Sequence, residues 1–424
     1  MARAVYSLLF TLAMPLIWLR LLWRARRQPE YLHHLGERHG FYAPRPTAPL
    51  IWLHAVSVGE TRAAEPLIAA LLERYPGHAL LLTHMTPTGR ATGRALIERH
   101  PGRLTQAYLP YDLPATAGRF LDHFRPQIGL LMETELWPNL LDAARRRRLP
   151  VALINARLSV RSQRGYRRLQ HLIGPALASL SAIAAQTAAD GERLQQLGAC
   201  AISICGNLKF DATPAAEKLQ QGASWRQALS HRPVWLAAST REGEEALILD
   251  AFAALACPGL LLVLVPRHPQ RFAEVAELVA ARRLTCCRRS EGHLPSLATQ
   301  VWLGDSMGEM AAYYAVADLA LIGGTLRPFG GQNLIEAAAC GCPVLVGPHS
   351  FNFAEASVDA IACGAARRVI DAADAALVAA ELLGDRPQLL GMRRAALTFS
   401  QVHRGATVRT LMLIDRLMAL PAGR

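Results

Sequence analysis

Three carboxylates stand where a side chain could carry out proton chemistry. Glu60 lies in IWLHAVSVGET, directly after an apolar run, and Glu133 and Glu135 follow another apolar run in IGLLMETELWPNL. A carboxylate kept ionised by a helix N-terminus can accept a proton from an attacking hydroxyl. Ser57 and Glu60 also fit a capping box, and Glu133 and Glu135 could cap the next helix. Both the catalytic and the capping interpretation therefore stay open for these acids.

Cations and glycine loops follow apolar runs in the second half of the chain. Arg267 and His268 come just after such a run in VLVPRHPQRF, where a cation could bind a phosphate. The segment WLGDSMGEM offers backbone amides around Gly308, because glycine lets a ligand approach the main chain. The segment IGGTLRPFGGQNLIEAAACGCPVLVGP ends its glycine loop at Asn333 and Glu336. Glu336 could bind ribose hydroxyls, or it could simply supply charge at a helix N-terminus.

The basic residues are nearly all arginine, which makes each lysine more conspicuous. The lysines are Lys209 and Lys218, and Lys209 could act as a point charge near a phosphate or a sugar carboxylate. The run Arg145–Arg148 is interpreted mainly as a solvated face, with attraction to lipid phosphates as the alternative. The same interpretation applies to Arg157, Arg161, Arg164, Arg167 and Arg168.

Short β-rich apolar runs alternate with longer helical stretches, which predicts parallel, doubly wound sheets. The runs are 50–56, 79–83, 128–132, 151–155, 182–186 and 202–205, and then 234–238, 260–265, 301–304, 319–323 and 343–347. The carboxyl ends of parallel strands meet at one edge of a sheet, where open α/β folds bind ligands. The chain is therefore predicted to be α/β with two Rossmann-like domains in tandem, and its acids and cations should line those edges.

The domain boundaries follow from this pattern. Residues 28–210 and 231–400 are the two predicted Rossmann-like domains, joined by a polar linker at 211–230. Residues 401–424 should form a C-terminal helix that could cross back to the first domain.

The N-terminal segment, residues 1–27, is predicted to be a membrane anchor. Met1 to Trp23 is apolar and free of acids, and Arg24, Arg26 and Arg27 follow it. Bulky residues precede this positive charge, which disfavours a cleaved signal peptide. The charge-free stretch from Ala4 to Leu19 would measure about 24 Å as a helix, against a hydrocarbon core of about 30 Å. This helix could span the membrane if the bilayer thins locally, or it could lie in the membrane–water interface. In either case the positive-inside rule predicts that the rest of the chain is in the cytoplasm.

Composition narrows the class of protein and partner. The 424 residues are 51% hydrophobic, enough for two buried cores, and the net charge of +13 indicates an acidic partner. That partner could be an anionic membrane, a phosphorylated lipid or nucleic acid, but the interleaved aromatics of nucleic-acid modules are missing. The eight cysteines include no CxxC, so reduced thiols are expected and no metal site is assigned to Cys340-Gly-Cys342.

Nine segments in order along the chain are similar to one family, the Kdo (3-deoxy-D-manno-octulosonic acid) transferases of glycosyltransferase family 30. They are HAVSVGET, TPTG, YLPYDLP, METELWPNL, NARLS, GNLKFD, PRHPQRF, GDSMGEM and GGQNLIEAAA. The resemblance implies a GT-B fold, in which two Rossmann-like domains face a cleft. It also implies CMP-Kdo as donor, a lipid A precursor (lipid IVA) as acceptor, inversion at the anomeric carbon, no metal or cofactor, and residence on the cytoplasmic face of a bacterial inner membrane rich in anionic lipids.

The resemblance also assigns residues. It implies that Glu60 is the general base and that Glu133 and Lys209 support the transition state. It places the CMP site on Arg267, His268, Met307, Gly308, Glu309, Asn333, Leu334, Ile335 and Glu336. The chain departs from the family at AASTREGEE, so no sugar contact is carried over to Ser239, Thr240 or Arg241.

The chemistry agrees with these assignments. Kdo leaves a single phosphate through an oxocarbenium-like state, and cations and backbone dipoles can stabilise the charge that builds on CMP. The sequence contains no DxD pair of the kind that holds a metal and a diphosphate. The rival interpretations are a GT-B heptosyltransferase or nucleotide-sugar epimerase, and an inactive membrane-bound binding protein. The joint presence of Glu60, Glu133, Lys209 and Arg267 argues against the inactive protein.

Overall fold

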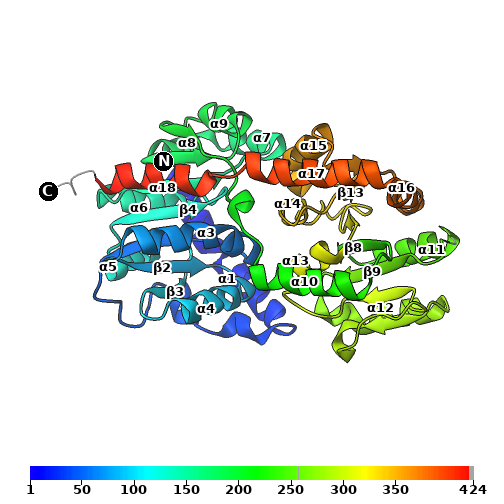
Figure 1. Cartoon of the computed structure of the whole chain (residues 1–424). Coiled ribbons are helices and arrows are strands. Elements are labelled where there is room, and N and C mark those ends of the chain that lie inside the picture. The colour runs from blue at the N-terminus through cyan, green and yellow to red at the C-terminus, as the bar shows by residue number, and fades with distance from the viewer. Residues whose placement is uncertain (256, 420–424) are drawn as a thin grey trace. The chain divides into compact units, whose positions relative to one another are not determined.

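The computed structural model describes residues 1–255 and 257–419. They form two compact units, the first made of Met1–Ala212 with the C-terminal residues from Arg404, the second of Thr213–His403. Each unit contains a seven-stranded parallel sheet with helices packed against it (Figure 1). This confirms the predicted α/β fold with two doubly wound sheets and an apolar N-terminal helix.

The first sheet has the strand order β3-β2-β1-β4-β5-β6-β7. Chain order therefore reverses between the neighbours β1 and β4, where Leu53 pairs with Leu130. The strands are β1 (Leu50–His54), β2 (Ala79–His84), β3 (Leu104–Tyr108), β4 (Ile128–Met132), β5 (Val151–Ala156), β6 (Ala182–Ala185) and β7 (Ile202–Ile204). The helices are α1 (Ala2–Ala25), η1 (Pro29–Leu32), α2 (Leu35–Arg38), α3 (Val58–Arg74), α4 (Pro87–Arg99), α5 (Pro114–Phe124), α6 (Pro138–Arg146), α7 (Val160–Arg168), α8 (Gln170–Ala178), α9 (Ala188–Gln195), η2 (Leu208–Asp211) and α18 (Ala406–Met418).

The second sheet has the order β10-β11-β9-β8-β12-β13-β14, which reverses between β8 and β12. Its strands are β8 (Val234–Thr240), β9 (Leu261–Pro266), β10 (Cys286–Arg288), β11 (Val301–Leu303), β12 (Leu319–Ile322), β13 (Val344–Val346) and β14 (Ala366–Arg368). Its helices are α10 (Ala216–Ala228), α11 (Glu244–Leu255), η3 (Pro269–Arg271), α12 (Phe272–Ala281), η4 (Arg289–Glu291), α13 (Met310–Val316), α14 (Leu334–Ala339), η5 (Phe351–Phe353), α15 (Ala354–Ala362), α16 (Ala372–Gly384) and α17 (Arg386–Val402).

Both faces of the first sheet are buried, which explains why its strands are continuous apolar runs rather than alternating ones. On β1, Ile51 and Leu53 enter one core and Leu50 and Trp52 enter the other. Trp52 is fully buried, and its indole N–H donates a 2.8 Å hydrogen bond to Thr83 Oγ1. The neighbouring strand leaves room for the ring at Gly129, where a Cβ would lie 2.7 Å from it.

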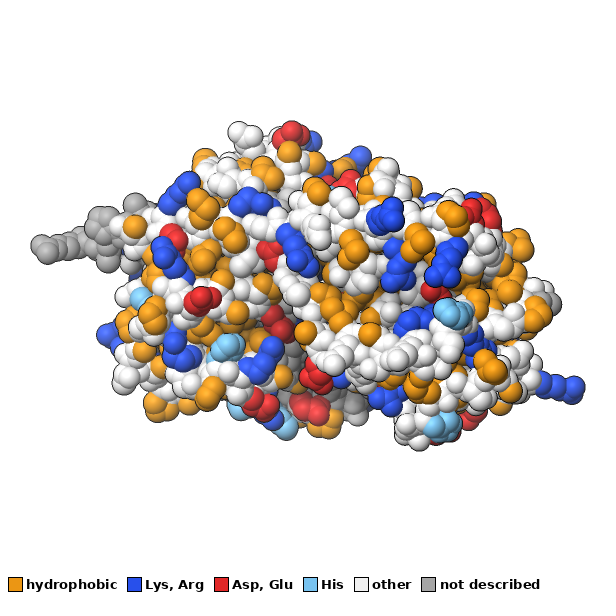
Figure 2. All heavy atoms as spheres, viewed as in Figure 1, with side chains coloured by type: hydrophobic (Ala, Val, Ile, Leu, Met, Phe, Trp, Pro, Cys, Tyr) orange, Lys and Arg blue, Asp and Glu red, His pale blue; other side chains and the backbone are white. Residues whose placement is uncertain are grey.

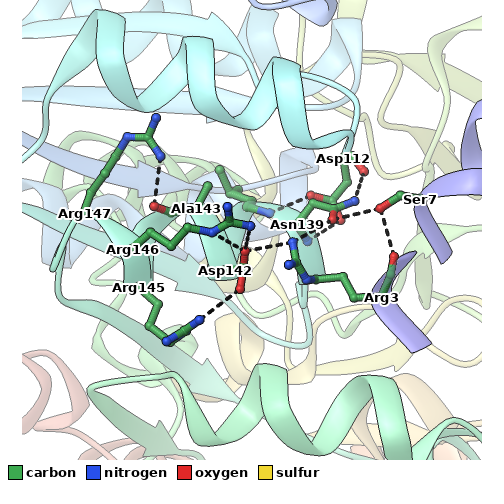
Figure 3. Close-up of polar contacts among 10 residues, drawn as sticks. Arg3, Ser7, Asp112, Asn139, Asp142, Ala143, Arg145, Arg146 and Arg147 are labelled. Carbon is green, nitrogen blue, oxygen red and sulfur yellow. Dashed lines mark hydrogen bonds and ion pairs between the residues drawn. The ribbon is translucent and has the colours of Figure 1, made fainter. Parts of the chain in front are cut away.

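The N-terminal helix α1 lies against its own unit along one face. Its inner face places Arg3 NH1 at 2.8 Å from an Asp142 carboxylate oxygen, and Ser7 donates a 3.0 Å hydrogen bond to the Asn139 side chain (Figure 3). Asn139 donates in turn to the backbone carbonyl of Asp112, whose carboxylate accepts from the first amides of α6. The outward face of α1 is apolar and exposed, through Val5, Leu8, Leu9, Leu12, Leu16, Leu19, Leu22 and Trp23.

Three edge or near-edge strands were not predicted from the sequence. β3 carries half-buried Thr105 and Gln106 in place of an apolar run, and β10 and β14 are three residues long. The segment 211–230, expected as a polar linker, is mostly the helix α10. It packs on α13 so closely that a Cβ on Gly222 would lie 2.5 Å from the Ala312 carbonyl oxygen.

The C-terminal prediction also differs from the structure. The sequence predicts one helix over 401–424, whereas α17 ends at Val402 and α18 begins at Ala406. Gly405 has φ +92°, a left-handed conformation that glycine adopts without steric cost, so the chain turns between the two helices. Asp211 accepts hydrogen bonds from the backbone N–H groups of Gly405 and Thr407, which ties this turn to the first unit. Residues 420–424 of the predicted helix lie outside the described residues.

The positive charge is dispersed on the face drawn in Figure 2. Lys and Arg side chains there are interspersed with apolar and acidic ones and do not form one continuous track. The arginines of α6 are paired with acids, since Arg145 and Arg146 contact Asp142 and Arg147 contacts Asp122. The run Arg145–Arg148 is therefore largely paired with acids of its own unit.

Candidate active site

The predicted catalytic residues of the first unit all follow strands of its sheet. Glu60 lies in the first turn of α3 after β1, and Glu133 follows β4 directly. Lys209 lies in η2 after β7. Because β1 and β4 are adjacent at the point where strand order reverses, this edge is the place where an open α/β sheet binds its ligand.

Glu60 is part of a helix cap, and its carboxyl group also has a raised pKa. Ser57 is the N-cap of α3, and its hydroxyl donates a 2.9 Å hydrogen bond to Glu60 Oε1, while the Val56 N–H donates to Oε2 at 2.8 Å. Burial raises the pKa of Glu60 to about 7, opposed by the Val56 hydrogen bond and reinforced by the nearby charge of Glu133. A carboxylate with a pKa near neutral is suited to general base catalysis.

Glu133 holds two cations at the strand edge. Its Oε1 lies 3.3 Å from Lys209 Nζ, and its Oε2 lies 3.3 Å from Arg157 Nε. Its backbone is left-handed, with φ +56°, at the sharp turn that follows β4. The Arg157 side chain is 43% exposed, as a solvated face requires, and its guanidinium is also paired with Glu133, a contact that the sequence interpretation did not include. Only the position of Arg157 just after a β-strand could have indicated this.

Two amide side chains fix the Lys209 segment. Asn155 Oδ1 accepts a 3.0 Å hydrogen bond from the Leu208 N–H, and Asn207 Oδ1 accepts a 3.0 Å bond from the Lys209 N–H. Asn155 is buried and has φ +50°, a conformation that asparagine tolerates better than most residues. The segments NARLS and GNLKFD therefore meet at this point. The Asn155–Leu208 hydrogen bond that joins them spans 53 positions of the sequence.

Two further residues belong to this edge: Glu135, which the sequence left open as a site residue or a helix cap, and His54, to which the sequence assigned no role. Glu135 lies near Glu60, and burial together with the Glu60 charge raises its pKa to about 7. Its Oε2 is 3.9 Å from Nε2 of His54, which is fully buried at the end of β1. The sequence signal that could have identified His54 was its position at the end of an apolar strand. A histidine at that position lies either in the core or at the edge of the sheet where a ligand would bind.

In the second unit, cations gather after β8 and β9. Arg267 and His268 follow β9, Arg241 follows β8, and the Arg267 N–H donates a 3.0 Å hydrogen bond to the Thr240 carbonyl. Partial burial lowers the pKa of His268, and the charges of Arg241, Arg267 and Arg271 lower it further. An electropositive edge of this kind favours a phosphate ligand.

A buried carboxylate organises the glycine loop beside these cations. Glu244 is fully buried and accepts hydrogen bonds from the backbone N–H groups of Arg241 (2.8 Å), Gly324 (2.6 Å) and Leu326 (2.9 Å). The loop approaches β8 so closely that a Cβ on Gly323 would lie 2.4 Å from the Ser239 carbonyl oxygen. Glu244 therefore joins the loop after β8 to the loop after β12.

The other predicted CMP-site residues occupy loops after β11 and β12. Met307 is 53% exposed, Gly308 has φ +76°, and the Glu309 carboxylate accepts from Ser306, Gln221 and Arg289 at 2.6 to 3.0 Å. Burial opposes ionisation of Glu309, but these three bonds hold its pKa below the ordinary value.

The remaining four predicted CMP-site residues lie at the start of helix α14. Asn333 caps it by accepting from the Ile335 N–H at 3.1 Å, and Glu336 lies half-buried in its first turn. The side chains of Leu334 and Ile335 are 1% exposed and belong to the interior. Of these two residues, only the main chain could therefore meet a ligand.

Among the described residues, Cys287, Glu291 and His293 have ligand atoms within 4.8 Å of one another. Burial, reinforced by the charge of Glu291, raises the pKa of Cys287 to about 11. The thiol is therefore protonated near neutral pH, and only the thiolate is a good metal ligand. Cys340 and Cys342 are free thiols, and burial raises the pKa of Cys340 to about 12.

Comparisons with known proteins agree on one family. The family model described as 3-Deoxy-D-manno-octulosonic-acid transferase (kdotransferase) matches residues 33–212. A 3-deoxy-D-manno-octulosonic acid transferase of Bordetella pertussis is 48% identical, covering 98% of this chain and 99% of the relative. Another, of Haemophilus influenzae, is 38% identical, covering 98% of both chains. A solved glycosyltransferase from Rickettsia africae has a TM-score of 0.61 at 13% identity, covering 88% of this chain and all of that one, a similarity of fold alone.

Proposed function

This chain belongs to the Kdo transferase family of glycosyltransferases, and on that premise we propose that it moves Kdo from CMP-Kdo to a lipid A precursor, lipid IVA, in the biosynthesis of the lipopolysaccharide core. The observation that carries the proposal is the half-buried Glu60, a carboxylate with a pKa of about 7 at the switch point of the first sheet. Glu133, Lys209 and Arg157 lie on the same edge of that sheet.

The proposed reaction is a single displacement with inversion. Glu60 takes the proton from an acceptor hydroxyl, and the oxygen forms a bond to the anomeric carbon of Kdo. The bond between that carbon and the phosphate oxygen breaks, and its electron pair leaves with CMP. Lys209 and Arg157, held by Glu133, supply positive charge at the strand edge for the sugar carboxylate or the departing phosphate.

The donor site is proposed for the second unit. Arg267 and His268 would face the phosphate, the Met307–Glu309 segment would contribute main-chain groups, and Asn333 to Glu336 would bind the ribose. The cations after β8 and β9 support this assignment, because their positive charges, together with partial burial, lower the pKa of His268, and positive charge at this edge favours an anionic ligand. Cations and amides can stabilise a single leaving phosphate, and we propose that the enzyme requires no metal or cofactor.

We propose that α1 attaches the enzyme to the cytoplasmic face of the bacterial inner membrane and that it lies in the interface. Among the described residues it is the one helix long and apolar enough to cross a membrane. Its inner face, however, is bound to α6 through Arg3 and Ser7, while its outer face is a stripe of exposed leucines (Figure 3). A helix whose first two turns are bound to its own domain matches an interfacial helix. Arg20, Arg24, Arg26 and Arg27 would attract anionic lipids.

The decisive experiment incubates the full-length protein with CMP-Kdo and lipid IVA and weighs the lipid products. A gain of one or more Kdo masses, dependent on CMP-Kdo, is the expected result. A protein that binds CMP-Kdo but leaves the lipid mass unchanged would be the inactive binding protein instead.

A further inference from the structure

The tautomer of His54 can be deduced from its contacts. Its Nδ1 lies 3.1 Å from the Thr83 carbonyl oxygen and 2.9 Å from Thr83 Oγ1. The carbonyl oxygen can only accept, whereas the Thr83 hydroxyl can donate or accept, so the tautomer that makes both contacts favourable carries its proton on Nδ1. Complete burial lowers the pKa of His54 to about 3, so the ring is neutral and holds that one proton. Nε2 is therefore a bare acceptor.

The Glu135 carboxyl group lies beside that bare nitrogen. His54 Nε2 is buried and makes no hydrogen bond within the described part of the chain, and Glu135 Oε2 lies 3.9 Å from it. An ionised Glu135 would direct a lone pair at another lone pair. A protonated Glu135 could instead donate its O–H to Nε2 after a shift of less than about 1 Å, since such bonds form below about 3.2 Å. Burial raises the pKa of Glu60 and of Glu135 alike to about 7. A hydrogen bond to Nε2 would satisfy a costly buried acceptor and would be available to Glu135, so Glu135 should hold its proton to a higher pH than Glu60 does.

The other charges around Glu135 point the same way. Glu60 and Glu133 both disfavour a second negative charge here, and the cations Lys209 and Arg157 are paired with Glu133. The Trp137 side chain favours the ionised form, but less than burial and the Glu60 charge each oppose it. Among the ion pairs of the described residues, none joins Glu135 to a lysine or arginine. Tyr166 lies nearby, and its pKa is raised by burial and by Glu135. His84, on β2, is neutral because burial lowers its pKa to about 4.

We propose that Glu135 is a positioning residue that stays protonated, donates its O–H to Nε2 of His54, and thereby leaves Glu60 free to ionise as the base. The base assignment rests on the proposed function. Without this arrangement two neighbouring carboxyls would compete for one proton, and neither would be reliably ionised. The buried His54 decides which of them keeps the proton, because it offers an acceptor to Glu135 alone.

Infrared difference spectroscopy tests the protonation directly. The full-length wild-type protein, titrated across pH 5 to 9, should keep the C=O stretch of one neutral carboxyl after Glu60 has ionised, and Glu135→Gln should remove that band. The measurement needs no substrate, so it can fail or succeed independently of Kdo transfer. Absence of the band at pH 8 in the wild type would overturn the proposal, even if the variants do not fold.

The pH dependence of turnover gives a second readout. Glu135→Gln is neutral at every pH and its amide can donate to Nε2, so kcat should stay within about threefold of wild type. The acid limb set by Glu60 should stay where it is. If Glu135 were ionised during turnover, its replacement by Gln would remove a negative neighbour and shift that limb to lower pH by about one unit, which would contradict the proposal. Glu135→Ala cannot donate a hydrogen bond to Nε2, so its kcat should fall at least about tenfold. Because Glu135→Gln also lacks a negative charge and should be nearly normal, the fall in Glu135→Ala would reflect the lost hydrogen bond and not a lost charge.

Discussion

Replacement of Glu60 by Gln separates its capping role from its proposed catalytic role. The Gln carbonyl oxygen can accept from the Val56 N–H, as Glu60 Oε2 does at 2.8 Å. Its NH2 group would then face the Ser57 hydroxyl, which now donates to Glu60 Oε1 at 2.9 Å but can rotate and accept. The cap therefore survives with neutral hydrogen bonds in place of charge-assisted ones. This exchange should cost about 1 kcal/mol, or a fall in Tm of about 2–4 °C.

The effect on the reaction should be far larger. Gln cannot accept the acceptor's proton, and loss of a general base typically lowers the rate by about 10² to 10⁴, equivalent to about 2.7–5.5 kcal/mol in the barrier. Affinity for CMP-Kdo should be nearly unchanged, because the proposed donor site belongs to the second unit.

The assay compares turnover, CMP-Kdo affinity and Tm for the wild type, Glu60→Gln and a matched control. Glu65→Gln is that control, since Glu65 lies on the same helix and makes only an exposed ion pair with Arg99 at 3.0 Å. The control should be near normal in all three measurements. Near-normal turnover of Glu60→Gln would refute the base assignment, and so would a fall in Tm large enough to explain the lost activity.

Other consequences of the site can be measured separately. Because Glu60 must be unprotonated and its pKa is about 7, turnover should fall with decreasing pH and reach about a tenth of its plateau at pH 6; a flat profile from pH 6 to 8 would contradict this. Glu244→Ala leaves three backbone N–H groups without their acceptor and should cost at least about 3 kcal/mol by denaturant unfolding, with weaker CMP-Kdo binding by calorimetry. EDTA should leave activity intact, and loss that magnesium restores would disprove the metal-free chemistry. Changing Leu8, Leu12 and Leu16 to Gln should abolish sedimentation with anionic vesicles without lowering Tm, whereas Leu377→Gln, at an exposed site of the second unit, should change neither.

The sequence was most informative where parallel strands end. Glu60, Glu133, Lys209 and Arg267 each follow a strand run, and the rule that such ends share one edge was enough to group them within each sheet. The pairing of Arg157 with Glu133 was not predicted, because its position just after a strand was the one signal, and a surface arginine and a site arginine otherwise look alike until the turn after β5 is built. The contact between His54 and Glu135 joins two neighbouring strands, and the strand order was not readable from the runs.

The hydrophobic pattern of the sequence did not reveal the short and the polar elements, for a different reason. A strand of three residues, such as β10 or β14, gives too few positions for a periodicity to develop. β3 lies at the edge of its sheet and tolerates polar residues, so its sequence does not read as buried. The helix α10 has apolar residues on no single face in the sequence, and its packing depends on Gly222 allowing close approach to α13.

The return of the chain to the first unit has a consequence for its synthesis. Ile414, fully buried, and its neighbours on α18 complete the core beside α3, and Asp211, two residues from Lys209, binds the turn at Gly405. Because translation proceeds from the N-terminus, α1 is synthesised well before the residues that secure the lysine segment. The first domain can therefore finish folding only after the whole second unit has been synthesised. A truncation that removes α18 would disturb the segment that carries Lys209, although nearly 200 residues separate the two in sequence, as the Gly405–Asp211 contact spans 194 positions.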